Sequence, residues 1–246
     1  PLQGEVLRDG RGLLRVECSG EACARLAAGE AVQELSALLE VPLRVEEQGP
    51  DHLSLVQQEP LMAVAGVAAR KKDGETVSGD AGTYFKRSDG TLYVLLCDGM
   101  GSGPQANRES TLALRLLEQF LQAGVDTEQA LITLNSALAL RGEEAGGFTT
   151  IDLLQVDLFT GDGVVFKLGA APTYVRKSGT VRRISGTALP AGLSADEKTA
   201  PDRFPLHLSP GDCVLMVSDG VAGTGDDSWL RKRFGAFQGE SPKELA

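Results

Sequence analysis

An apolar run that ends in an aspartate and three closely spaced glycines restricts the fold of this chain more than any other feature. The run reads VLLCDGMGSG over residues 94–103, and residues 91–98 have the composition of a β-strand. A carboxylate is unfavourable inside the apolar core that such a strand occupies. The glycines indicate a tight turn, because glycine permits the backbone angles that the turn needs. A helical pattern follows Pro104, and the first turn of a helix tolerates proline. The sequence therefore predicts a strand, a sharp turn that carries Asp98, and a helix.

Two further aspartates stand in similar surroundings. Asp219 and Gly220 close the apolar run DCVLMVSDG, and Asp80 follows a turn of small residues in VSGDAG. If the two apolar strands are neighbours in one sheet, their aspartates meet at one edge, where a loop could bring Asp80. Carboxylates gathered in this way repel one another unless a cation neutralises them or one takes up a proton. Mg²⁺ or Mn²⁺ suits such oxygen ligands, and Gly99 would let a backbone carbonyl turn toward the ion. The alternative is three ordinary turns.

Other site types fit the sequence less well. A phosphate-binding loop at GMGSG lacks its closing Lys-Ser/Thr pair, and GDDSW lacks the spacing of a calcium loop. The two histidines, His52 and His207, have no second ligand at metal-binding spacing, and an ordinary structural placement is favoured for both. The four cysteines contain no CxxC pair, which favours a reducing, cytoplasmic setting.

The charge balance narrows the possible partners. The 246 residues include 34 acidic and 24 basic side chains, which gives a net charge of -10. A nucleic-acid or anionic-membrane surface would need an excess of Lys and Arg, so neither is expected as a partner. The longest apolar run, residues 61–69, is roughly half a membrane span, and no signal segment opens the chain. A soluble domain is the resulting expectation.

The patterns predict an α+β protein with two parts. Residues 1–59 combine short strands with a helix over residues 23–41, which makes a small α+β segment with a regulatory or linking role. Residues 60–246 begin with an expected strand at 61–69 and continue with the strand at 91–98. A helix pair follows over 104–140, in which Asp126 can cap the second helix. From residue 148 the apolar residues recur with the period that is typical of antiparallel strands, and Ser178-Gly179 is expected to form a hairpin turn. Sheets covered by helices are expected.

Several motifs together resemble the SpoIIE-type serine phosphatases of the metal-dependent PPM class. The resemblance covers about residue 61 to the end, and the first 60 residues are similar to the segment that precedes the phosphatase in that family. It implies an α-β-β-α sandwich of antiparallel sheets flanked by helices. The motifs are SGD at 78–80, DGMGSG at 98–103, Glu109-Ser110 on the next helix, FTTIDLL from Phe148, LGAAP from Leu168 and SDG from Ser218.

The resemblance also implies a chemistry. It implies two Mn²⁺ ions, with Mg²⁺ as a possible substitute, that activate a water molecule to attack a phosphoserine. By matching motif, Asp98 would bridge the two ions, Asp80 and the Gly99 carbonyl would complete one ion site, and Asp219 would bind the other ion. Metal ions can lower the pKa of water and offset phosphoryl charge, so no side-chain nucleophile is needed.

The implied substrate is a phosphorylated anti-sigma factor antagonist, whose dephosphorylation activates a sporulation sigma factor. The complete protein would be anchored in the cell membrane by segments outside this chain, with this domain in the cytoplasm, and a homodimer is possible. One departure is that the family's later Asp-Asp-Met-Thr type motif does not occur before Ala246, so a closing strand and one ligand are expected to be missing. The alternatives are a weak or inactive PPM-fold regulatory or scaffold module, and a metal-dependent enzyme acting on small phosphate compounds.

Overall fold

The computed structural model of the chain describes residues 3–21, 23, 30–141, 148–193, 200–223 and 225–237. Contacts between Cα atoms divide the chain into two compact units, Pro1–Pro60 and Leu61–Ala246. Each unit has a hydrophobic core of its own. No helix among the described residues combines the length and the hydropathy of a membrane-spanning segment.

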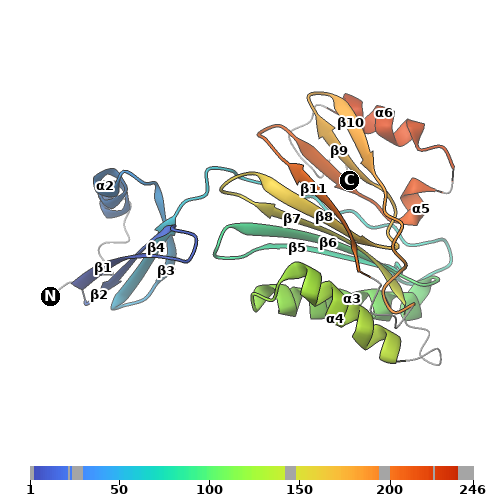
Figure 1. The fold of residues 1–246 in the computed structure, drawn as a ribbon, viewed down its shortest axis with the longest axis horizontal. Helices are drawn as coiled ribbons and strands as arrows, with labels where there is room; N and C mark the ends of the chain where they lie inside the picture. The colour runs from blue at the N-terminus through green and yellow to red at the C-terminus, as the bar shows by residue number, and fades with distance from the viewer. Residues whose placement is uncertain are drawn as a thin grey trace. The chain divides into compact units, whose positions relative to one another are not determined.

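In its described residues, the first unit is one antiparallel sheet covered by one helix (Figure 1). Its sheet has the order β1-β2-β4-β3, and its core joins Val32 and Leu35 of the helix to Val16, Leu53 and Leu55 of the sheet. The helix ends at Leu39 rather than at the predicted residue 41, because Glu40 adopts a positive φ angle, and residues 24–29 of the prediction lie outside the described residues. Strand β1 was not predicted, because all six of its residues are exposed and it carries no apolar alternation. The elements are β1 (Gln3–Arg8), β2 (Leu14–Ser19), α2 (Glu30–Leu39), β3 (Leu43–Gln48) and β4 (His52–Gln57).

The second unit contains two antiparallel sheets and two helical layers. The larger sheet has the order β11-β8-β7-β6-β5, and the smaller has the order β10-β9-β12. The strands of the larger sheet are β5 (Asp80–Lys86), β6 (Thr91–Gly99), β7 (Thr149–Asp157), β8 (Asp162–Leu168) and β11 (Asp202–His207). Those of the smaller sheet are β9 (Thr173–Lys177), β10 (Thr180–Ile184) and β12 (Cys213–Met216). The helices are α3 (Gly103–Gln122), α4 (Thr127–Leu140), α5 (Asp219–Ala222) and α6 (Ser228–Ala236).

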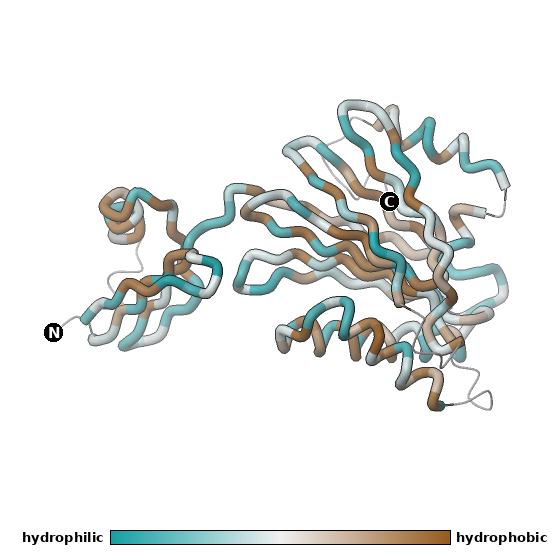
Figure 2. Tube along the Cα trace, viewed as in Figure 1, coloured by the Kyte–Doolittle hydropathy of each residue, from teal (hydrophilic) through white to brown (hydrophobic). Residues whose placement is uncertain are grey.

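These elements form layers in the order helices, sheet, sheet, helix, and three hydrophobic clusters fill the spaces between the layers. One face of the larger sheet packs on α3 and α4, with Leu95 and Leu153 against Leu117 and Leu131. Its other face packs on the smaller sheet through the cluster that includes Leu154, Val165, Val175 and Ile184. Tyr174 on the outer side of the smaller sheet meets Leu230 and Phe234 of α6. The predicted α-β-β-α sandwich is confirmed, and Figure 2 shows hydrophobic residues along its central strands.

The strand predicted at residues 61–69 is wrong. These residues form no strand, and Met62, Val64 and Val67 are 89%, 65% and 59% exposed. Leu61 packs on the core between the sheets, and its amide donates to the carbonyl of Leu158 at 3.2 Å. An apolar run becomes a strand only where a neighbouring strand accepts and donates hydrogen bonds, and hydropathy does not reveal whether that neighbour is present.

Candidate metal centre

Asp80 and Asp98 lie directly opposite each other on adjacent strands. They are register partners in the β5–β6 ladder, so both side chains lie on the same face of the sheet. Along β6 the buried residues alternate, and Cys97 and Gly99 face α3. Asp98 therefore points to the opposite face, toward the smaller sheet. The prediction that a loop carries Asp80 is corrected, because Asp80 is the first residue of β5.

Asp219 approaches the same place from the other sheet. It is the first residue of α5 and follows β12, which belongs to the smaller sheet. The sequence raised the condition that the strands leading to Asp98 and Asp219 are neighbours in one sheet, and the structure places them in different sheets. Asp219 nevertheless lies close enough to Asp98 to raise its pKa. The hydroxyl of Ser218, the residue before Asp219, donates to Oδ2 of Asp80 at 2.9 Å, which joins the start of α5 to the start of β5.

The pKa of Asp98 shows that the three carboxylates interact. Partial burial raises it first, and hydrogen bonding and repulsion from Asp80 and then Asp219 raise it further, from 3.8 to about 7. Among the described residues, no three His, Cys, Asp or Glu side chains are grouped so that they could hold a metal ion as they stand. The carboxylates are thus close enough to perturb one another without being closed around an ion. Their oxygen-only donor set and mutual repulsion fit a divalent cation.

Gly99 lies against the backbone of α3. A Cβ atom at this position would stand 2.0 Å from the carbonyl oxygen of Ala106. Only glycine permits that approach, since real Cβ contacts are never so short. The turn that carries Asp98 and the first turn of α3 are therefore packed together directly.

Polar side chains hold the strand ends in place through hydrogen bonds to the backbone. The hydroxyl of Thr149 donates to the Asp98 carbonyl at 2.8 Å, and the hydroxyl of Ser110 donates to the Gly79 carbonyl at 2.6 Å. The amide of Asn107 donates to the Ser78 carbonyl at 2.9 Å. Ser110 stands in a motif that resembles the family, whereas Asn107 carries no signal in the sequence. Helix α3 thereby holds the backbone of the two residues that precede Asp80.

A buried ion pair lies farther along the face that carries Asp98. Lys167 Nζ stands 2.8 Å from Asp152 Oδ1, and both side chains are fully buried. Thr173 of the smaller sheet accepts from Lys167 and donates to Asp152. Burial raises the pKa of Asp152 and lowers the pKa of Lys167, while their contact favours the charged forms of both. These groups tie the two sheets together beneath the site.

A second ion pair links the two helices of one layer. Arg141, at the end of α4, contacts the largely buried Glu109 of α3 through both guanidinium nitrogens, at 2.8 and 3.4 Å. The two helices are therefore joined close to the end of α3 that packs on Gly99.

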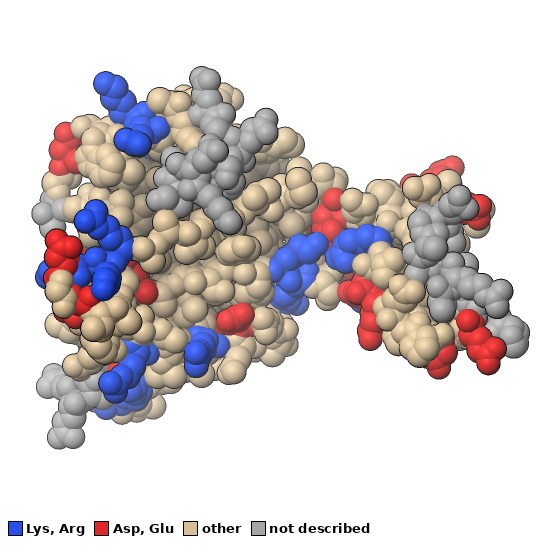
Figure 3. Space-filling model, turned by 180° about the vertical axis from the view of Figure 1, so that it is seen from behind, with Lys and Arg blue, Asp and Glu red and all other residues tan. Residues whose placement is uncertain are grey.

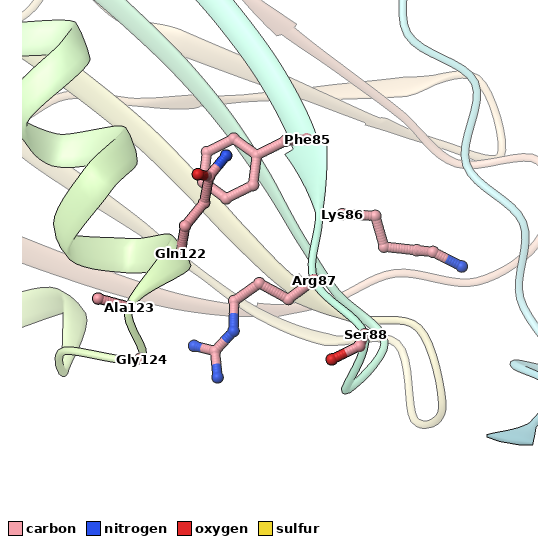
Figure 4. A pocket seen from close by; sticks show the side chains of 7 residues that line it. All are labelled: Phe85, Lys86, Arg87, Ser88, Gln122, Ala123 and Gly124. Carbon is pink, nitrogen blue, oxygen red and sulfur yellow. The ribbon is translucent and has the colours of Figure 1, made fainter. Parts of the chain in front are cut away.

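One surface pocket is separate from the carboxylates. It has a volume of about 310 Å³ and is lined by residues 85–88 and 122–124. Figure 4 shows Lys86 and Arg87 pointing to different sides of this pocket rather than converging. Lys86 ends β5 and Asp80 begins it, so the pocket and the carboxylates lie at opposite ends of that strand, roughly 20 Å apart. We assign no chemistry to this pocket.

Comparison with known proteins identifies the family. The sequence model of the family described as Stage II sporulation protein E (SpoIIE) matches residues 88–246, more than half of the chain. The chain belongs to the SpoIIE family. Stage II sporulation protein E of Priestia megaterium is 31% identical over 204 residues, which cover 81% of this chain and 34% of that protein. The protein of the same name from Bacillus subtilis strain 168 is 27% identical over 226 residues, which cover 86% of this chain and 27% of that protein.

Solved structures agree with the SpoIIE assignment. The PP2C phosphatase domain of Bacillus subtilis SpoIIE, with a fragment of its regulatory domain, superposes with a TM-score of 0.75 at 25% identity, covering 99% of this chain and 74% of that chain. RsbX in complex with magnesium shares the fold, with a TM-score of 0.57 at 20% identity, covering 82% of this chain and 88% of that chain. This SpoIIE chain therefore contains a PP2C-type protein phosphatase domain. It spans about a third or less of the length of the curated relatives.

Proposed function

We propose that this SpoIIE-family chain is the catalytic part of a metal-dependent protein serine phosphatase. The observation that carries the proposal is the meeting of Asp80, Asp98 and Asp219 from two sheets, with the pKa of Asp98 raised to about 7. The proposed substrate is a phosphorylated anti-sigma factor antagonist, and the proposed outcome is activation of a sporulation sigma factor. For the whole protein we propose a homodimer that is anchored in the membrane through segments outside this chain.

The proposed metal ligands are Asp80, Asp98 and Asp219 together with the Gly99 carbonyl, and the proposed ions are two Mn²⁺, with Mg²⁺ as the alternative. Such ions, when bound, lower the pKa of a coordinated water and offset negative charge on the phosphoryl oxygens. The relative crystallised with magnesium supports a divalent cation for this fold. Ser218 orients Asp80, and Thr149 fixes the backbone of Asp98, so both carboxylates are held before an ion arrives.

The cysteine next to Asp98 is not a candidate nucleophile. Cys97 is adjacent to Asp98, but it faces the helices, and burial raises the pKa of its thiol to about 12. A neutral, fully buried thiol does not attack a phosphoryl group. The arrangement therefore favours attack by water over a covalent phosphocysteine route.

The test compares the wild-type chain with Asp98→Asn and with Asp162→Asn, an exposed aspartate on β8. Calorimetry measures Mn²⁺ binding, and phosphate release is measured from a phosphoserine protein and from p-nitrophenyl phosphate. We expect Asp98→Asn to weaken Mn²⁺ binding at least about tenfold and to abolish phosphate release, because a shared anionic ligand is lost. Asp162→Asn is expected to match the wild type.

The alternatives predict other results. Absence of Mn²⁺ binding and turnover in the wild type would support a regulatory or scaffold module. Much faster turnover of the small ester than of the phosphoprotein would support an enzyme for small phosphate compounds.

A further inference from the structure

Helix α6 carries a tryptophan and two cations on one exposed face. Trp229, Lys232 and Arg233 are spaced i, i+3 and i+4, so they are neighbours on the helix surface. Trp229 is 54% exposed, and it is the single tryptophan of the chain. Leu230 and Phe234 lie on the other side of the helix and are buried against the smaller sheet. We call Trp229, Lys232 and Arg233 the α6 face.

The helix is fastened to the sheet by one buried carboxylate. Asp227 accepts a hydrogen bond from the Tyr174 hydroxyl at 2.7 Å and from Nε of Arg183 and Arg231 at 2.9 Å each. Because of these bonds and of the buried apolar side, α6 presents its outer side in a fixed position over β9 and β10 (Figure 1). Arg231 is engaged in the ion pair with Asp227, which it shares with Arg183, so we do not count it in the α6 face.

The two cations of the α6 face are not neutralised within the described part of the chain. Neither Lys232 nor Arg233 has an ion-pair partner there, although the whole chain has a net charge of -10. In Figure 3, basic and acidic side chains are mixed over the second unit, while acidic side chains gather on the first. Two cations without an ion-pair partner among the described residues therefore lie beside an exposed indole, in a chain that is acidic as a whole.

We propose that the α6 face docks the protein that carries the phosphoserine, through an acidic surface segment with an apolar side chain at its centre. The inference rests on the proposed function. An exposed Trp supplies contact area at a small entropic cost, and Lys and Arg beside it select negative charge. The chain reaches α6 soon after Asp219, the proposed ligand at the start of α5. The face would thus hold a substrate protein whose phosphoserine enters the metal centre.

A protein partner fits better than a lipid surface. An amphipathic helix binds a membrane by burying a continuous apolar face. In α6 the apolar side chains Leu230 and Phe234 are already buried in the protein, which leaves Trp229 as the large apolar group of the exposed face.

Fluorescence of Trp229 tests the inference directly. The probes are two phosphoserine peptides of equal length, one with Glu and Leu around the phosphoserine and the other with Lys and Leu. We expect the acidic peptide to shift the emission of Trp229 and to shield it from acrylamide, with weaker binding as salt rises. The double variant Lys232→Glu/Arg233→Glu is expected to bind this peptide about tenfold more weakly or worse. The control is Arg115→Glu/Arg203→Glu, which makes the same change in net charge at exposed positions on α3 and β11.

Four results would overturn the inference: an unchanged Trp229 emission, equal affinity for both peptides, equal effects of the two double variants, or a response to anionic lipid vesicles in place of the acidic peptide. Release of phosphate from p-nitrophenyl phosphate is measured in parallel on every variant. Turnover of this ester by the wild type with no peptide-dependent change in Trp229 would refute docking and leave the phosphatase proposal standing. Peptide binding that depends on Lys232 and Arg233 without any turnover would refute the phosphatase proposal instead.

Discussion

Asp98 lies in an environment that disfavours the ionisation of its own side chain. It is partly buried, it faces Asp80 across the β5–β6 ladder, and Asp219 reaches it from the other sheet. A fold selected only for stability would not place two carboxylates where they raise the cost of ionising a third, Asp98. The raised pKa of Asp98 is therefore a cost that a bound cation would remove.

The first prediction concerns metal-free protein in the presence of a chelator. Because the pKa of Asp98 is about 7 in the folded state and near 3.8 in the unfolded state, the folded state binds more protons than the unfolded state between about pH 4 and 7. Ionisation of Asp98 therefore lowers the free energy of unfolding as pH rises through this window. The free energy of unfolding of Asp98→Asn is expected to rise above that of the wild type across the same pH window. The difference amounts to about 1–2 kcal/mol after discounting for solvent screening, and it stays constant above pH 7.

Urea unfolding at several pH values measures this difference. Asp73→Asn, a change at an exposed loop position, serves as the control and is expected to show no such trend. A stability difference between Asp98→Asn and the wild type that does not change with pH would contradict the raised pKa.

At the scale of elements, the turn after β6 and the first turn of α3 act as one packed unit. Gly99 touches the α3 backbone at Ala106, and Ser110 and Asn107 of the same helix hold the carbonyls of Gly79 and Ser78. The ends of β5 and β6, which carry two of the proposed ligands, are thus positioned by one helix. Through these contacts a movement of α3 would reach both strand ends.

The second prediction follows from the close approach at Gly99. Gly99→Ala is expected to lower the free energy of unfolding by about 1–3 kcal/mol, because the added methyl group meets a backbone oxygen that cannot rotate away. Thermal unfolding should report a loss of about 2–4 °C for each kcal/mol, and Mn²⁺ affinity should fall as α3 is displaced. Gly225→Ala is the matched control, since no atom lies within 4 Å of its Cβ position. Equal effects of the two substitutions would show that the approach of α3 is not tight.

Most elements could be predicted from local pattern, and the exceptions have physical reasons. Strand β6, helix α3 and the Ser178-Gly179 turn are local, and both turn residues adopt the positive φ angles that a two-residue hairpin needs. The exposed run at 61–69 and the edge strand β5 depend on which strand lies beside them, and periodicity does not contain that information. For the same reason Asp98 and Asp219 could be named as candidates, but their approach across two sheets could not be foreseen.

At the scale of the whole molecule, the chain contains two hydrophobic cores of unequal size. The core of the first unit is small and includes Val16, Leu43, Leu53 and Leu55, while the second unit has three clusters around its two sheets. The proposed metal ligands all belong to the second unit. We therefore propose that the boundary at Pro60 separates a regulatory or linking segment from the phosphatase domain.

The third prediction is that the two units unfold in separate thermal transitions. The first unit is expected to unfold at the lower temperature, because a unit of 60 residues buries a smaller fraction of its surface. Added Mn²⁺ should raise only the transition of the second unit, since a ligand stabilises the unit that binds it. Scanning calorimetry with and without Mn²⁺ measures both effects. One transition that shifts as a whole would contradict this division.

The β5–β6 hairpin also limits how the gene for this chain can change in length. Asp80 and Asp98 face each other because each strand alternates its side chains and the turn at residues 87–90 sets their register. One codon gained or lost between Asp80 and the turn, or between the turn and Asp98, would rotate one carboxylate to the helical face of the sheet. The tip of the hairpin can absorb such a change, because it lies at the far end of both strands. Related genes should therefore differ in length at this tip while the two strands keep theirs.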